Sequence, residues 1–418
     1  MEETYFGVEE EQRNFKRNFA ANFFDYVFYD LGMSFAAPNT VLVAFVSEII
    51  KSNLAISLLS FLWAVGWFLP PLFSAHYVEK LEWRKNFVLL ISSWEVIPWL
   101  FLSISSLFSS SMPVFMTLML IFLFYGLSNF AGGISYPAWL DVLGKVIPQN
   151  KRGFFLGLST FCGGLLSIIG GIVLGFLLET YPFPKNYSIC FFIAFIFFAI
   201  SLTSFSFTKE PPSLKVRQDG MFKTYLSDLF SILKIDRNFR FFIISNMFLC
   251  FQNVTITFLM AFAVQTFELS GTSIGIFTSL YLGSNTITNL LWGFIGDRWG
   301  HLHVARLGVV GIMITSLLAA YTRSPFILYL LFVMAGTGSA AIIFSNMNLL
   351  FELSKEERRP SYVALFTVFQ VPFTVLSALM GGIIADFFNY HTLFLLTSLI
   401  LLPGLLFLLL IKKTTTDN

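Results

Sequence analysis

Twelve apolar stretches, each long enough to cross a lipid bilayer as a helix, dominate this chain. They lie at residues 20–46, 53–75, 87–108, 113–138, 154–178, 187–207, 240–266, 273–295, 304–321, 325–350, 362–385 and 392–411. A membrane-spanning helix needs about 20 mostly apolar residues, because the hydrocarbon core is about 30 Å thick. Since 56% of the residues are hydrophobic and only 12% are charged, the chain has too little polar surface to cover these helices in water. The sequence therefore predicts an all-α membrane protein with twelve transmembrane helices.

The basic residues predict how these helices are oriented. If the N-terminus is cytoplasmic, 23 of the 26 Lys and Arg residues fall on the cytoplasmic side, and only Lys51, Lys185 and Arg323 fall on the other. Cytoplasmic loops normally carry such an excess. We therefore expect an integral protein of the cell (cytoplasmic) membrane with both termini in the cytoplasm. The net charge of only +2 gives no reason to expect a nucleic-acid partner.

A polar stretch divides the twelve segments into two sets of six. We expect an N-terminal half at 1–207, a cytoplasmic linker at 208–239 and a C-terminal half that follows at 240–418. Within the linker, residues 221–234 place apolar side chains on one helical face and polar side chains on the other. Such a helix is typical of a segment that lies flat on the membrane surface. Packing of this helix against the inner ends of the bundle is the alternative.

The two halves carry the same pattern of charges in corresponding loops, after their second and fourth spans. The corresponding residues are Glu79 and Asp297, Asp141 and Glu352, and Arg152 and Arg359. A repeat of this kind is typical of transporters whose halves are related by an axis along the membrane normal. The sequence therefore predicts two pseudo-symmetric six-helix bundles.

These loops resemble those of the major facilitator superfamily. The signature of that family after the second helix is Gly, three residues, Asp, a basic residue, one residue, Gly, one residue and two basic residues. The second half keeps Gly293, Asp297, Arg298 and Gly300 but has Leu302 and His303 for the basic pair. The first half keeps Glu79, Lys80, Arg84 and Lys85 but has Ala75 and Glu82 for the glycines. The resemblance covers nearly the whole chain. It implies a 12-span bacterial-type permease that works by alternating access, as a monomer and without a cofactor.

The charged loop residues are candidates for an inner gate. An acid and a basic side chain at helix ends can pair when the cytoplasmic side is closed and separate when it opens, and a helix N-terminus can also hold the acid. The alternative is that these are ordinary loop charges that only fix the orientation. The expected gating residues are Glu79, Arg84, Asp141, Arg152, Asp297, Arg298, Glu352 and Arg359.

Carboxylates inside the expected spans are candidates for the transport site. An ionised acid at the centre of a span costs roughly 2.5–3.5 kcal/mol, so it normally faces protein or water. Asp25, Tyr29 and Asp30 lie in the first span and Glu95 lies in the third, whereas no Lys or Arg lies near the middle of any span. A buried carboxylate without a cation readily takes up a proton, as a proton-coupled carrier requires. The alternative is that these acids are exposed to water and permanently ionised. This alternative is strongest for Asp25.

The second half offers amides in place of acids. Gln252 and Asn253 in the seventh span, and Asn285 and Asn289 in the eighth, are expected to contact the substrate. Amides in spans also join neighbouring helices, which is the alternative for these four. The glycines at 163–175 of the fifth span predict close helix packing. Asp386, at an outer helix end, is expected to be a solvated cap.

Together these features predict a secondary active transporter of a small solute, with proton-coupled export of a cationic or neutral amphipathic compound as the first expectation. Carboxylates and aromatic rings suit a cation, whereas a dedicated anion site would normally use Arg or Lys. A sugar or other neutral-solute permease, and a lipid translocator of the same fold, are the alternatives. We expect no enzyme and no metal, since the sequence has no metal-ligand cluster, catalytic triad or phosphate-binding loop. The expected partners are the solute, protons and the lipid bilayer.

Overall fold

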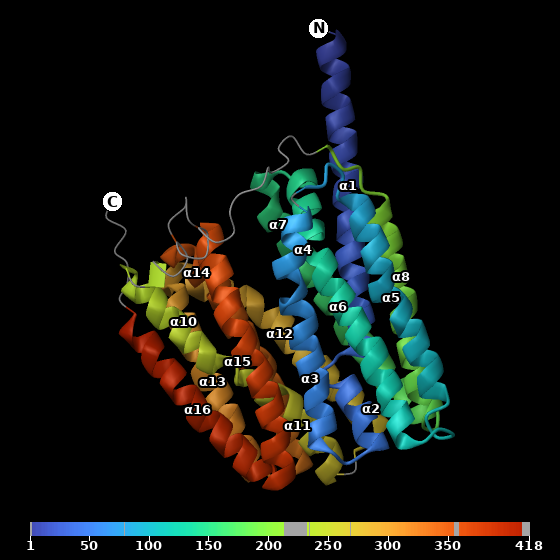
Figure 1. The fold of residues 1–418 in the computed structure, drawn as a ribbon, viewed down its shortest axis with the longest axis vertical. Coiled ribbons are helices and arrows are strands. Elements are labelled where there is room, and N and C mark those ends of the chain that lie inside the picture. Colours follow the sequence, from blue (N-terminus) through green and yellow to red (C-terminus); the bar gives the residue numbers. More distant parts are fainter. Residues whose placement is uncertain are drawn as a thin grey trace. The chain divides into compact units, whose positions relative to one another are not determined.

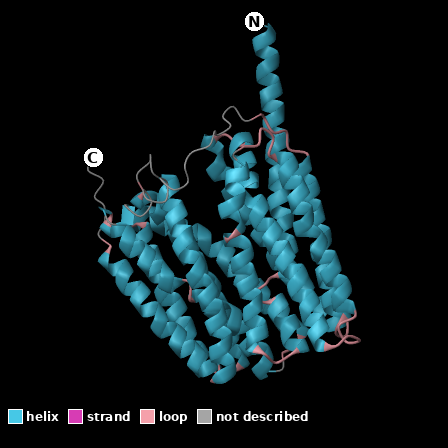
Figure 2. Ribbon diagram, viewed as in Figure 1, coloured by secondary structure: helices cyan, strands magenta, loops and turns pink. Residues whose placement is uncertain are grey.

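Helices and loops make up the whole described part of the chain. The computed structural model describes residues 2–78, 80–212, 232–233, 235–267, 269–354 and 359–411, with the side chains of 2–13, 72, 76, 359–361 and 364 left out. Every regular element in these residues is a helix (Figure 2), so the predicted all-α fold is confirmed. The linker helix predicted at 221–234 falls outside the described residues, except for Ile232 and Leu233.

Fifteen helices follow one another along the described residues (Figure 1). Those of the first half are α1 (Glu2–Ala36), α2 (Val41–Ile49), α3 (Asn53–Phe68), α4 (Pro70–Val78), α5 (Lys85–Leu107), α6 (Val114–Val146), α7 (Gln149–Thr180) and α8 (Lys185–Ser206). Those of the second half are α10 (Arg237–Leu249), α11 (Gln252–Phe267), α12 (Gly271–Trp299), α13 (His301–Tyr321), α14 (Pro325–Leu353), α15 (Arg359–Phe387) and α16 (Tyr390–Leu410).

Eleven stretches of the described helices are long and apolar enough to cross a membrane. They coincide with eleven of the twelve expected spans, and α12 covers the remaining one with 29 residues that include many Thr, Ser and Asn. The first, second and seventh spans each consist of two helices with a short break. Pro38 lies in the first break and Pro70 follows the second, where a missing backbone N–H ends the helical hydrogen bonding.

The helices form two compact units that do not coincide with the two halves of the sequence. Unit 1 comprises residues 1–37, 65–218 and 270–279, and unit 2 comprises residues 38–64, 219–269 and 280–418. Each unit therefore includes a segment contributed by the other half of the chain. The division into halves at the linker stays a prediction.

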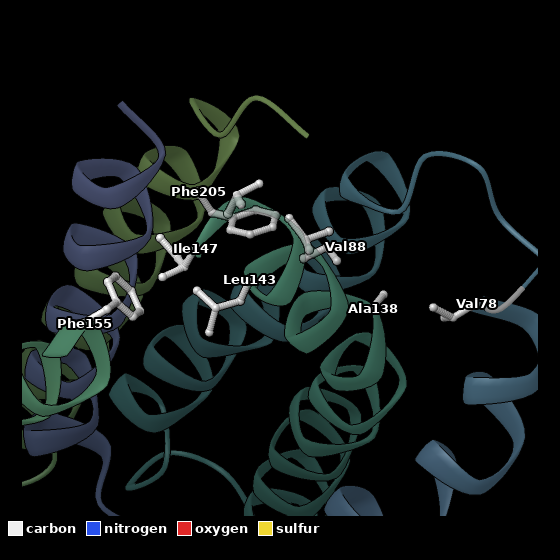
Figure 3. Close-up of a cluster of buried hydrophobic side chains, with 9 residues drawn as sticks. Val78, Val88, Ala138, Leu143, Ile147, Phe155 and Phe205 are labelled. Atoms are coloured by element: carbon white, nitrogen blue, oxygen red, sulfur yellow. The ribbon is translucent and has the colours of Figure 1, made fainter. Parts of the chain in front are cut away.

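In unit 1, α1 packs against α7 and α8, α5 packs against α6 and α8, and α4 packs against α6. One end of these helices encloses a cluster of buried side chains that includes Val88, Leu143, Ile147, Phe155 and Phe205 (Figure 3). The start of α12 joins this unit through α7, where Ser279 donates a hydrogen bond of 3.0 Å to the carbonyl of Ile168.

In unit 2, α13 packs against α14 and α16, and α11 contacts α2, α14, α15 and α16. Residues 38–64, which come from the first half of the chain, are held in this unit by polar contacts. Asp386, at the end of α15, accepts hydrogen bonds from the backbone N–H groups of Asn53 and Leu54 at 2.8 and 2.9 Å. Asp386 is exposed and caps α3 rather than its own helix, which uses the partial positive charge at a helix N-terminus.

Glycines allow backbones to touch where helices of unit 1 cross. A Cβ added to Gly133 of α6 would collide with the carbonyl oxygen of Gly66 in α3, and one added to Gly66 would lie 2.6 Å from the Cβ of Asn129. By contrast, a Cβ added to Gly157 of α7 would meet no atom within 4 Å. Only small residues permit this close approach, as in many membrane helix pairs.

Gly133→Ala is therefore expected to destabilise the protein, although alanine is the better helix former. Overpacking costs about 1–3 kcal/mol, which exceeds the gain of about 0.5–1 kcal/mol from replacing a helical glycine. Thermal unfolding in detergent, followed by intrinsic fluorescence, should show a lower midpoint for this variant. Gly157→Ala is the matched control and should leave the midpoint unchanged or raise it. Equal midpoints for the two variants would contradict the close α3–α6 contact.

Candidate functional site

Glu95 and Tyr29 form a hydrogen-bonded pair between α5 and α1. The Tyr29 hydroxyl donates to Oε1 of Glu95 at 3.0 Å. The carboxylate lies against α6, where a Cβ added to Gly132 would be 3.0 Å from the same oxygen. Both residues are half-buried. Gly132 therefore leaves the space that the carboxylate occupies, and Tyr29 serves Glu95 rather than a carboxylate on its own helix.

Asp30 follows Tyr29 on α1 and lies against α7. A Cβ added to Gly163 would be 2.5 Å from Oδ2 of Asp30, and the backbone carbonyl of Asp30 accepts a hydrogen bond of 2.9 Å from Ser167. The carboxylate itself has no hydrogen-bond partner among the described residues. Asp30 directly follows Tyr29 in the chain and Tyr29 donates to Glu95, so these three residues are here called one cluster. Of the acids in this cluster, Asp30 is the one left free for a ligand or a proton.

Asp25 is engaged at both carboxylate oxygens. Ser201 of α8 donates to Oδ1 at 2.6 Å, and the indole Nε1 of Trp139 in α6 donates to Oδ2 at 2.9 Å. Only 7% of Asp25 is exposed. An indole N–H can only donate, so Oδ2 must act as an acceptor here. Asp25 therefore joins α1, α6 and α8, and this fixed arrangement distinguishes it from Asp30.

Three aromatic side chains, here called the aromatic ladder, extend from Glu95 towards Asp25. Trp139 stacks on Tyr136 with ring centres 6.1 Å apart, and Tyr136 meets the edge of Trp67 at 5.7 Å. Trp67 lies 3.5 Å from the position of a Cβ on Gly132, next to Glu95. The ladder was not predicted from the sequence. The spacing of three residues between Tyr136 and Trp139 was its only signal, because such residues share one face of a helix.

The amides of the second half lie in unit 2. Asn285 donates to the carbonyl of Gly336 at 3.4 Å, and Asn289 donates to Oδ1 of Asn285 at 3.4 Å, so this pair connects α12 to α14. Gln252 is buried at the start of α11, and its Oε1 has no partner among the described residues. Asn253 is half-buried beside it in the chain. Gln252 thus keeps an acceptor for a ligand, whereas Asn285 and Asn289 act as links between helices.

Four charged residues of unit 1, from the start of α5, the end of α6 and the segment after α8, form a network. Arg84 forms an ion pair with Asp141, and Lys145 lies 3.2 Å from Asp141 and 2.7 Å from Glu210. Arg84 and Asp141, two of the expected gating residues, thus contact each other within one unit. Lys145 and Glu210 complete the network of four charged residues.

Glu210 is the member of this network that sequence reasoning missed. Its carboxylate accepts the backbone N–H of Arg84 at 2.9 and 3.1 Å and that of Lys85 at 2.8 Å, where α5 begins. Its side chain is only 1% exposed. The residue belongs to the polar stretch after α8, and no local pattern marks it as a partner of a helix more than a hundred residues earlier. It binds where the helix dipole favours an anion.

The other predicted gating residue of the first half, Arg152, binds backbone rather than an acid. Its guanidinium donates to the carbonyl of Ile147 at 2.9 Å and to that of Gly144, so it caps the end of α6 from the first turn of α7. Basic groups stabilise the negative end of a helix in this way. Glu79 and the side chain of Arg359 lie outside the described residues.

The second half places a histidine between its repeated acidic residues. Glu352, at the end of α14, lies 2.5 Å from Nδ1 of His301, and Asp297 of α12 lies 3.9 Å from Nε2 of the same ring. Arg298 is exposed to solvent. Asp297 and Glu352, which the repeat pattern singled out, therefore meet at His301, a residue that the motif comparison had left aside.

Comparisons with known proteins agree with this architecture. Residues 241–418 match the family model of the Major Facilitator Superfamily. The solved structure of the nucleoside transporter NupG superposes with a TM-score of 0.68 at 15% identity, covering 96% of this chain and 99% of that one. The chain has the major facilitator fold. The resemblance predicted from the loop motifs is confirmed, as is the prediction of an integral membrane protein.

Two further solved structures show the same fold. A POT family transporter in complex with 5-aminolevulinic acid has a TM-score of 0.70 at 12% identity, with 97% of each chain covered. A D-xylose–proton symporter has a TM-score of 0.67 at 14% identity, with 91% of this chain and 96% of that chain covered. No curated protein sequence matches the chain significantly. These matches establish the fold of the chain.

Glu210→Ala is expected to loosen the start of α5. Removing the carboxylate leaves the backbone N–H groups of Arg84 and Lys85 without their acceptor, which costs about 1–3 kcal/mol. Hydrogen exchange of the peptide that contains Arg84 and Lys85 should accelerate by about tenfold, because about 1.4 kcal/mol corresponds to that factor. Glu82→Ala, which removes an exposed acid from the same loop, is the control and should exchange as the unmodified protein does. Unchanged exchange in Glu210→Ala would show that the carboxylate does not cap α5.

Proposed function

We propose that this protein is a secondary active transporter that couples proton movement to the export of a cationic or neutral amphipathic compound by alternating access. It would act as a monomer in the cell membrane, with both termini in the cytoplasm. The observation that carries the proposal is the cluster of Asp30, Tyr29 and Glu95 in unit 1. Acids are rare in membrane spans and usually mark ion or substrate pathways.

Asp30 and Glu95 are the candidates for proton coupling. Asp30 has no hydrogen-bond partner among the described residues, and Glu95 accepts only from neutral groups such as Tyr29. Loss of a proton from either carboxyl group adds a negative charge that attracts a cation, whereas the protonated group donates a hydrogen bond. Proton binding and solute binding are then linked through the same side chains, which is the requirement for coupled transport.

The aromatic ladder supports a cation as the solute. Trp, Tyr and carboxylate groups attract organic cations, because the face of an aromatic ring carries negative potential. Trp67 reaches the neighbourhood of Glu95, so a flat cation could contact a ring and a carboxylate at once. The carboxylates of Asp25 and Glu95 accept hydrogen bonds from Ser, Trp and Tyr side chains, and an acidic environment of this kind disfavours an anionic solute.

A neutral-solute permease is the second candidate. Gln252 offers a buried amide oxygen that lacks a partner among the described residues, and indole rings and amides also suit sugars. The similar folds of a nucleoside transporter and of a D-xylose–proton symporter agree with this alternative at the level of architecture. Uptake and efflux assays across organic cations, nucleosides and sugars would separate the two candidates.

We further propose that the Arg84–Asp141–Lys145–Glu210 network holds the inner ends of α5 and α6 and the first linker residues together during the transport cycle. The segment at 207–209 is also bound to α1, since Asn18 exchanges hydrogen bonds with the backbone of Lys209 at 2.7 and 3.0 Å. A half that moves as one body needs such bonds at its inner end, where lipid no longer confines the helices.

Asp30→Asn and Glu95→Gln preserve shape but remove a titrating group. At least one of them should abolish accumulation driven by a pH gradient in proteoliposomes, while downhill exchange of the same compound remains measurable. The decisive measurement is the ratio of protons to solute moved by each variant. Glu48→Gln, an exposed carboxylate on α2, is the control and should keep the normal ratio. If both neutral variants still drive uphill transport with normal pH dependence, the coupling site lies elsewhere.

A further inference from the structure

The inner charges of the two halves differ in one chemical respect. In the first half, Arg84 directly precedes α5 and pairs with Asp141 near the end of α6. In the second half, His301 is the first residue of α13 and contacts Glu352 near the end of α14. Helices α5 and α13 are the third spans of their halves, and α6 and α14 are the fourth spans. In the motif alignment Leu302 corresponds to Arg84, so it is the residue before Leu302, His301, that contacts the acid in the second half.

The imidazole of His301 lies between two carboxylates on two different helices. Nδ1 is 2.5 Å from Oε1 of Glu352 on α14, and Nε2 is 3.9 Å from Oδ1 of Asp297 on α12. The side chain is 13% exposed. The ring packs beside Phe344, with centres 5.6 Å apart, and above Gly296, where an added Cβ would be 2.6 Å from the ring. Its position is thus fixed by packing as well as by charge.

Within the described residues, the ring has few other charged groups around it. In the described part of the chain, the charged groups that face the imidazole are Asp297 from α12 and Glu352 from α14. Arg298 and His303 are its nearest charged or titratable neighbours in sequence besides Asp297, and both are exposed. A change in the charge of His301 would therefore act mainly on the two carboxylates.

The difference matters because arginine is always charged, whereas imidazole changes its charge close to neutral pH. A neutral ring has one N–H, which Glu352 can accept, and its second nitrogen offers Asp297 only a lone pair. A protonated ring has two N–H groups and a positive charge between two negative ones. Protonation therefore turns one hydrogen bond into a bridge that attracts both helices.

We propose that His301 is a proton-operated clamp that draws the inner ends of α12 and α14 together through Asp297 and Glu352 as the pH on that side falls. The first half has no such response, because Arg84 stays charged. The orientation predicted from the basic residues makes the sensed pH that of the cytoplasm. The clamp would then adjust the mobility of the inner ends of the second half to the internal pH, separately from Asp30 and Glu95.

Spin labels on the two helices test the clamp without any solute. Phe294→Cys on α12 and Met347→Cys on α14 are exposed positions close to Asp297 and Glu352, and Cys162 would be replaced by Ala. Distances between the labels would be measured by pulsed electron paramagnetic resonance in nanodiscs at about pH 5.5 and about pH 8, on either side of the usual range for imidazole. The expected result is a shift to a shorter and narrower distance distribution at the lower pH.

Variants assign the shift to His301. His301→Arg should show the short distribution at both pH values, and His301→Gln should show the long one at both. Glu352→Gln should reduce the shift, because one of the two attracted charges is gone. His303→Gln, two residues along and exposed, is the matched control and should keep the full shift. A distribution that does not depend on pH in the unmodified protein would overturn the proposal, and so would an equal loss of the shift in His303→Gln.

A direct titration guards against variants that fail to fold. The chain has only four histidines, so His76, His303 and His391 can be replaced by Gln and the remaining ring followed by nitrogen magnetic resonance. Protonation of His301 over the same pH interval as the distance shift supports the clamp, whereas a ring that keeps one protonation state throughout refutes it. Neither measurement involves transport. A result that refutes the clamp would therefore leave the proposed transport function standing. A result that refutes the transport function would likewise leave the clamp standing.

Discussion

The lack of water in the bilayer core is the constraint on which the rest of this structure depends. Every backbone N–H and C=O group within the spans must find a partner inside the protein, and helices satisfy this requirement locally. Polar side chains face the same constraint. They contact helices that are distant in sequence, as Ser167 does with Asp30 and as Ser201 does with Asp25. Where helices touch through glycines, the space left by a missing side chain admits a carboxylate, as at Gly132 and Gly163.

The acids of unit 1 show that carboxyl groups can have different roles in one protein. Asp25 accepts two hydrogen bonds and is almost fully buried, so its carboxyl group is held by fixed donors. Asp30 lacks such donors among the described residues. Glu95 lies between these cases, with one phenol as its partner. The proposed proton coupling needs both kinds of group, because a rigid scaffold must hold the few side chains that take up and release protons.

The two copies of the inner-loop pattern have diverged in their chemistry more than in their position. Arg84 contacts Asp141 with a group that cannot lose its proton, and the buried Glu210 reinforces that contact from the linker. His301 contacts Glu352 with an imidazole, which is a group that can lose its proton. Both copies thus have a contact between a basic side chain and an acid at corresponding helix ends, and the choice between guanidinium and imidazole decides whether the proposed response to pH is available.

The sequence alone determined the helical fold and the places of the spans, because the apolar length needed to cross a bilayer is fixed by its thickness. It also identified the repeated charges, including Arg84, Asp141 and Glu352, because the loop motifs recur at repeat spacing. Only the tertiary structure decided which side chains meet. Tyr29 is one helical turn from Asp25, yet it donates to Glu95, 66 residues away. Glu210, Trp139 and His301 likewise find their partners on other helices. A hydrogen bond depends on the distance between atoms in space, and helix packing sets that distance through contacts that no local pattern records.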